Sequence, residues 1–120
     1  MEEETAITLT SANFDSEVLQ FPGVVLVDFW ATWCPPCRIM APHVENLVEK
    51  YKGNQKVKIG KLDVDENNDI SERYRVLSIP TFKVFVAGEP LDQRIGAVAP
   101  SELDSMIEQA LAKPSSAAAA

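Results

Sequence analysis

The chain has 120 residues, enough for one domain with a real core, because a domain takes about 150 residues. Hydrophobic residues make up 46% and charged residues 24%, a balance that excludes an intrinsically disordered chain. The formal net charge of -7 argues against nucleic acid and anionic membranes as partners. No apolar run approaches the roughly 18 residues of a membrane span, and residues 1–4 do not resemble a signal peptide, so we expect a cytoplasmic protein.

The first third of the chain predicts two strands and a short helix. Residues 6–9 alternate like a short strand, and Thr10 and Ser11 offer an N-cap to a brief helix over residues 13–19. Residues 24–30 form a nearly continuous apolar run, which is typical of a central strand covered on both faces. Only the carboxylate of Asp28 interrupts this run.

The middle third predicts a long helix, a strand and a second helix. Apolar residues recur at helical spacing on one face: Met40, Val44, Leu47, Val48 and Tyr51. This helix should end near Gly53, and Pro42 should kink it by removing one backbone hydrogen bond. Residues 57–64 read as a strand, and an acidic helical segment follows over residues 67–74.

The last third predicts a hairpin and a final helix. Strands over residues 82–86 and 91–95 flank a turn-rich connector at residues 87–90, which favours an antiparallel pair. Strands that alternate with helices before this hairpin imply right-handed parallel crossovers. We therefore expect an α/β fold with a mixed five-stranded sheet and about four helices on its two faces.

The final helix closes the predicted domain. Pro100 suits its first turn, and its apolar stripe contains Leu103, Met106, Ile107, Ala110 and Leu111. We expect a single domain over residues 1–112. Residues 113–120 should form a disordered tail, because they lack an apolar anchor.

The two cysteines, Cys34 and Cys37, are separated only by Pro35 and Pro36. A disulfide here closes a loop of about four residues and contributes only about 2 kcal/mol by chain entropy, so reversible chemistry explains the pair better than stability. The position between a strand and a helix places Cys34 at the helix N-terminus, where the dipole favours its thiolate as the attacking group. Cys37 lies one turn later, within reach to resolve the mixed disulfide.

Two other interpretations of the cysteine pair are half a metal site and a pair of inert core thiols. A structural zinc site needs four ligands, and the chain has a single histidine, His43. We therefore expect no metal.

The segment around the cysteines is more specific than the pair itself. Residues 27–38, Val-Asp-Phe-Trp-Ala-Thr-Trp-Cys-Pro-Pro-Cys-Arg, strongly resemble the active-site segment of the thioredoxin family. Further segments match in order and spacing, so that the resemblance covers residues 7–111: residues 40–42, 61–65, 78–81 and 95–97.

This resemblance implies a thioredoxin fold and a protein thiol-disulfide oxidoreductase that reduces disulfides in substrate proteins. It implies a redox-active Cys34–Cys37 disulfide in place of a bound cofactor. It also implies re-reduction by a thioredoxin reductase that uses NADPH, and we expect a monomer.

Asp28 and Lys61 are the predicted helpers of the cysteines. A carboxylate buried in a strand without a partner should have a raised pKa, which suits a proton acceptor. The resemblance implies that Asp28 assists the deprotonation of Cys37 and that Lys61 is its electrostatic neighbour. The alternatives are a carboxylate that is merely hydrogen-bonded and an ordinary strand lysine.

The resemblance also implies a substrate-docking platform. The Ile79–Pro80 bond matches the family's cis-proline position, in a loop that faces the cysteines and pairs with an extended substrate segment. The predicted apolar platform consists of Trp33, Ile79, Pro80, Gly96 and Ala97. A packing role is the alternative for Trp33, and it is the favoured one for Trp30.

The sequence departs from the usual family pattern at two places. The usual intervening pair is Gly-Pro, whereas Pro35 and Pro36 remove two N–H groups from the first helical turn, so this pair should tune the redox potential. Leu77 and Ser78 stand where many relatives have arginine and glycine, which leaves the docking rim less basic and less flexible. A specialised oxidant or isomerase on the same fold, and a non-enzymatic binding subunit, remain alternative functions.

Overall fold

The computed structural model describes residues 5–113. Each secondary-structure element falls close to its predicted position. In chain order the elements are β1 (Ile7–Leu9), the π-helical turn η1 (Asp15–Leu19), β2 (Val24–Trp30), α1 (Pro35–Lys50), β3 (Val57–Asp63), α2 (Asn68–Arg73), β4 (Thr81–Val86), β5 (Glu89–Ile95) and α3 (Pro100–Ala112).

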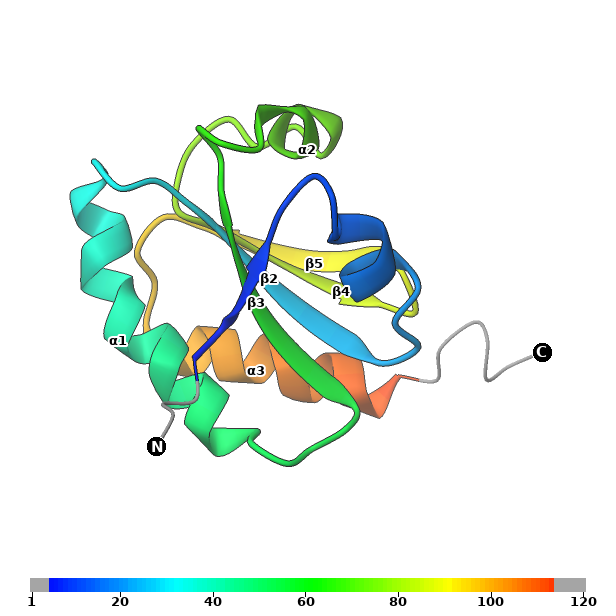
Figure 1. Cartoon of the computed structure of the whole chain (residues 1–120). Helices are drawn as coiled ribbons and strands as arrows, with labels where there is room; N and C mark the ends of the chain where they lie inside the picture. Colours follow the sequence, from blue (N-terminus) through cyan, green and yellow to red (C-terminus); the bar gives the residue numbers. More distant parts are fainter. Residues whose placement is uncertain (1–4, 114–120) are drawn as a thin grey trace.

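The five strands form one mixed sheet in the order β1-β3-β2-β4-β5. β3 pairs in parallel with both β1 and β2, and β4 pairs antiparallel with both β2 and β5. Figure 1 shows α1 and α3 on one side of the sheet and α2 with η1 on the other. The α/β fold expected from the element pattern is confirmed.

Two apolar cores lie on the two faces of the sheet because successive side chains of β2 point to opposite sides. Val24 and Leu26 belong to the cluster shared with α1 and α3, and Val25 and Phe29 belong to the cluster shared with η1 and α2. Six of the seven residues of β2 are buried. Asp28, the one charged residue in this apolar strand, therefore lies inside the protein on the α1 side of the sheet.

Several boundaries differ from the predictions. The hairpin connector is shorter than residues 87–90, because Ala87 and Gly88 both have positive φ and turn the chain alone, so that β5 already begins at Glu89. Leu111 is partly exposed and does not complete the buried stripe of α3. The Thr10 hydroxyl accepts from the N–H of Ala12 and of Asn13, but η1 itself starts later and has no side-chain cap.

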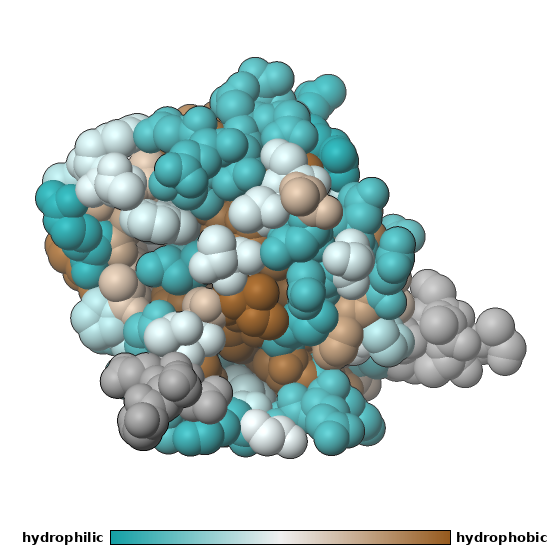
Figure 2. Space-filling view, in the orientation of Figure 1, coloured by the Kyte–Doolittle hydropathy of each residue, from teal (hydrophilic) through white to brown (hydrophobic). Residues whose placement is uncertain are grey.

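Figure 2 shows that hydrophilic residues cover most of the visible face, with apolar residues in the gaps between them, as the acidic composition leads us to expect. Within residues 5–113, no helix is long and apolar enough to cross a membrane. α3 ends at Ala112, and the tail predicted over residues 113–120 lies, apart from Lys113, outside the described residues.

Candidate active site

Cys34 and Cys37 form a disulfide at the junction of β2 and α1, with their Cα atoms 5.2 Å apart. Cys34 is the N-cap of α1 in an extended backbone conformation, and Cys37 lies one turn inside the helix. Both residues are buried in this oxidised form and pack with Ala31 against Val64 and Ile79. The predicted position of Cys34 at the helix N-terminus is confirmed.

The backbone donors around Cys34 are few. Pro35 and Pro36 occupy the first two helical positions and carry no N–H. The Cys37 N–H donates to Cys34 Sγ at 3.2 Å, and the Arg38 N–H donates to the Cys34 carbonyl at 3.2 Å. The N-terminal end of α1 therefore offers the Cys34 sulfur one backbone hydrogen bond.

Asp28 is a buried carboxyl group on the sheet face that α1 covers. It is 2% exposed, and its Oδ1 has no hydrogen-bond partner among the described residues. Burial raises the pKa of Asp28 from 3.8 to about 7, while the opposite charge of Lys61 lowers it by a smaller amount. Around neutral pH this group can therefore take up or release a proton without a large energetic cost.

Lys61 faces Asp28 from the neighbouring strand. The two residues are register partners in the parallel pair of β2 and β3, and both point to the α1 side of the sheet. The Lys61 ammonium lies 4.7 Å from the ring centre of Trp30, which is half-buried. The structure thus brings together the predicted carboxyl group and its predicted electrostatic neighbour.

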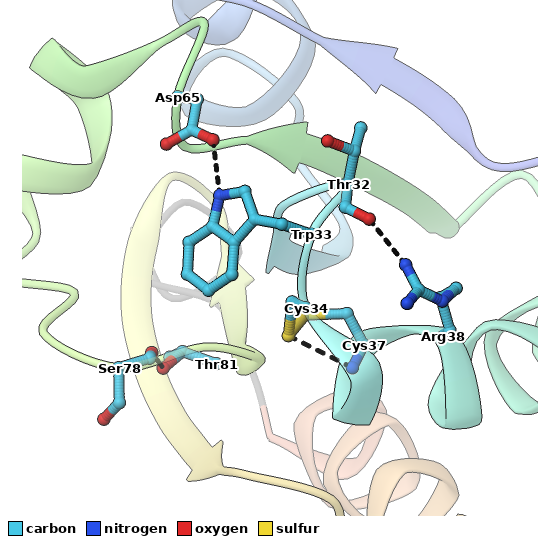
Figure 3. The surroundings of a disulfide bond; sticks show 8 residues. All are labelled: Thr32, Trp33, Cys34, Cys37, Arg38, Asp65, Ser78 and Thr81. Carbon is cyan, nitrogen blue, oxygen red and sulfur yellow. Dashed lines mark hydrogen bonds between the residues drawn. A yellow bond between two sulfur atoms is a disulfide. The ribbon is translucent and has the colours of Figure 1, made fainter.

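Trp33 lies exposed beside the disulfide, with 62% of its surface accessible. Its indole N–H donates to Asp65 Oδ2 at 2.7 Å, which holds the ring over the segment that follows β3 (Figure 3). A groove of about 350 Å³ runs from Trp33 past Leu77 to Ile79. Leu77 is 93% exposed, so this groove has a solvent-exposed apolar side chain at its rim.

The remaining platform residues surround Pro80. The Ile79–Pro80 peptide bond is cis, as the resemblance implied. The Pro80 carbonyl accepts from the Gly96 N–H at 2.7 Å, and Ile79 packs against the cysteine cluster. Ala97 is exposed next to Gly96, whereas the groove beside Trp33 is lined by Ile79 and not by Gly96 or Ala97.

Two contacts at the site were missed by the sequence analysis. Asp65 holds Trp33, and the guanidinium of Arg38 donates to the Thr32 carbonyl at 2.7 Å (Figure 3). Asp65 lies 32 residues from Trp33 in the chain, and no local pattern marks such a pair. For Arg38 the only signal was its position one turn after Cys34.

The site offers thiol chemistry rather than a cluster of metal ligands. Within residues 5–113, no group of three or more histidine, cysteine, aspartate or glutamate side chains is arranged to hold a metal ion. A reversible disulfide at the N-terminus of α1, with a buried carboxyl group of near-neutral pKa on the sheet face that α1 covers, is suited to thiol-disulfide exchange.

Comparison with known proteins agrees with this chemistry. The thioredoxin family matches the chain over residues 5–109, a span that contains both cysteines. The chain is also similar to the thioredoxins of Staphylococcus aureus strains Mu50, MW2 and N315. It is 46% identical to each over 105 residues, which cover 88% of this chain and 97% of each relative. Because the match spans nearly all of the described fold, the chain belongs to the thioredoxin family.

Proposed function

We propose that Cys34 is the nucleophile and Cys37 the resolving thiol of a protein-disulfide reductase. The family establishes protein thiol-disulfide exchange as the reaction, and the assignment of the two roles is the proposal. The observation that carries it is the place of Cys34 as N-cap of α1, because the helix dipole favours a thiolate there. Cys37 lies inside the helix, where its N–H already donates to Cys34 Sγ.

The proposed cycle transfers two electrons to the substrate. The Cys34 thiolate attacks one sulfur of the substrate disulfide, forms a mixed disulfide and releases the first substrate thiolate. Asp28 then accepts the proton of Cys37, a role supported by its burial and its pKa of about 7. The Cys37 thiolate attacks Cys34 Sγ, which closes the disulfide and releases the second substrate thiolate. Lys61, the register partner of Asp28, would stabilise its ionised form.

Substrates would dock over the platform that was predicted from the sequence. Trp33 and Ile79 line one groove beside the disulfide. Pro80 itself is buried in the structure, and the Gly96 N–H that donates to its carbonyl lies next to Ile79. Ala97 would contribute the end of the platform. An extended segment would pair with the backbone of the loop around Pro80, which is a strand-addition mode of recognition.

The proposed partners follow from the chemistry. Family membership implies disulfide-bearing substrates and a reductase as electron donor, and we propose an NADPH-dependent thioredoxin reductase for the second role. The redox group would be the Cys34–Cys37 disulfide itself, without a bound cofactor or metal. A dithiol that reduces other proteins works where thiols are kept reduced, which supports a cytoplasmic location. We propose that the protein acts there as a monomer.

Cysteine variants test the roles directly. Reduced wild-type protein should cleave the interchain disulfides of insulin, which precipitates the free B chain. Cys37→Ser should accumulate a mixed disulfide with the substrate that is visible by non-reducing electrophoresis, and Cys34→Ser should accumulate none. Normal product release by the Cys37 variant, or continued turnover by the Cys34 variant, would show that the roles are assigned wrongly.

A further inference from the structure

The turn that carries Cys34 joins the end of β2 to the start of α1. The Cys34 N–H donates to the Ala31 carbonyl at 3.3 Å, which closes this turn. Thr32 and Trp33 form its exposed corner, while Ala31 and Cys34 are buried. The orientation of the Cys34 sulfur therefore depends on how firmly this short turn is held against the helix.

The backbone of α1 holds the turn weakly. The first N–H groups of a helix normally bond to the N-cap residue or to the chain before it. Because Pro35 and Pro36 take the first two helical positions, Cys37 provides the only N–H of the first three helical residues. In the oxidised protein the disulfide supplements this contact, but that covalent link is lost when the cysteines are reduced.

A side chain compensates for the missing N–H groups. Arg38 lies on the second turn of α1, and its side chain points back towards the helix N-terminus, as helical side chains generally do. Its Nη1 donates to the Thr32 carbonyl at 2.7 Å, a short charge-assisted hydrogen bond (Figure 3). Its backbone N–H also donates to the Cys34 carbonyl. Arg38 thus contacts the turn on both sides of Trp33.

We propose that Arg38 is a positioning residue for Cys34, which holds the turn through the Thr32 carbonyl and keeps a positive charge on the turn that carries the thiolate. The kinetic part of this inference rests on the proposed role of Cys34 as nucleophile. Both effects of Arg38 act mainly on the reduced protein. The side-chain contact is needed most when the disulfide is open, and the charge interacts favourably with the thiolate but not with the disulfide.

Three variants separate this role from a general effect on stability. Arg38→Met removes the donors and the charge, Arg38→Lys keeps the charge and one donor group, and Lys52→Met removes a positive charge just beyond the other end of α1. Each oxidised protein is equilibrated with a series of glutathione buffers, and the fraction reduced is measured after acid quenching and alkylation. Arg38→Met should shift the equilibrium constant about fivefold towards the disulfide. A fivefold change for this two-electron couple corresponds to about 20 mV in the negative direction.

The rate of alkylation is measured on the same variants as a function of pH. Arg38→Met should move the midpoint of the profile for Cys34 to higher pH and slow the reaction at pH 7, with the modified cysteine identified by mass spectrometry. Arg38→Lys should restore most of the wild-type midpoint and of the wild-type rate at pH 7. Lys52→Met should match the wild type in the midpoint and in the rate.

The glutathione equilibrium decides between positioning and plain stabilisation. A residue that stabilises the oxidised and reduced forms equally does not change the potential. An Arg38→Met equilibrium within 1.5-fold of the Lys52→Met value, or a shift towards the dithiol, would therefore overturn the proposal. This equilibrium is the same whichever cysteine attacks, so it fails or succeeds independently of the cysteine-variant assay.

Discussion

Replacing Asp28 by asparagine tests whether the buried carboxyl group costs the folded protein free energy at neutral pH. The pKa of Asp28 is raised from 3.8 to about 7, so the folded state binds this proton more tightly than the unfolded state. The free energy of unfolding is then highest below the unfolded pKa and falls as the pH rises towards 7. Each pKa unit corresponds to about 1.4 kcal/mol, which gives a loss of about 4 kcal/mol between pH 4 and pH 8.

The Asp28→Asn protein lacks this titration, but it has a cost of its own. The amide NH2 of asparagine carries two donors where a protonated carboxyl group has one O–H, and a buried donor without a partner costs about 1–3 kcal/mol. The variant should therefore be about 1–3 kcal/mol more stable than the wild type at pH 8 and less stable by a similar amount at pH 4. Its turnover with insulin should fall at neutral pH, because Cys37 has lost its proposed proton acceptor.

Urea unfolding of the oxidised proteins at pH 4, 6 and 8 measures these differences without interference from free thiols. The control is Glu49→Gln, which removes an exposed carboxylate on α1. Its free energy of unfolding should show no pH-dependent gain over the wild type. If the stability difference between Asp28→Asn and the wild type is the same at pH 4 and pH 8, the argument from burial is wrong. Unchanged turnover would separately remove Asp28 from the mechanism.

Three further substitutions test other parts of the structure. Pro35→Gly restores an N–H at the start of α1 and loosens the loop, and each effect is about 1 kcal/mol. Glutathione titration should therefore show that the redox potential shifts by tens of millivolts in either direction. A shift below about 5 mV would show that Pro35 does not tune the potential. Arg75, just after α2, has a φ of 56°, a conformation that costs a residue with a Cβ more than it costs glycine. Arg75→Gly should therefore raise the unfolding free energy in urea by about 1 kcal/mol. A loss of stability would contradict this. A Cβ at Gly60 would lie 2.5 Å from Leu9 Cδ1, so Gly60→Ala should lower the unfolding free energy in urea by about 1–3 kcal/mol. If this clash is the cause, the double variant with Leu9→Ala should lose less unfolding free energy than the two single variants together.

The local elements of the fold could be predicted from the sequence because each depends on neighbouring residues. The apolar run over residues 24–30 could only be stable between two layers, and the helical spacing after Cys37 fixed which side of α1 is buried. The same local order placed Cys34 at a helix N-terminus. The raised pKa of Asp28 followed for the same reason, since a carboxyl group inside a buried strand has little access to water.

Apart from Asp28 and Lys61, which the resemblance had already paired, the tertiary structure decided which distant groups meet. Trp33 reaches Asp65 only because β2 and β3 lie in parallel and bring the ends of both strands to one edge of the sheet. The Thr32 carbonyl faces Arg38 because of the path of the turn, which depends on backbone angles rather than on residue type. Contacts of this kind have no periodicity in the sequence, since they are set by strand register and loop geometry, and these are fixed only when the whole core is packed.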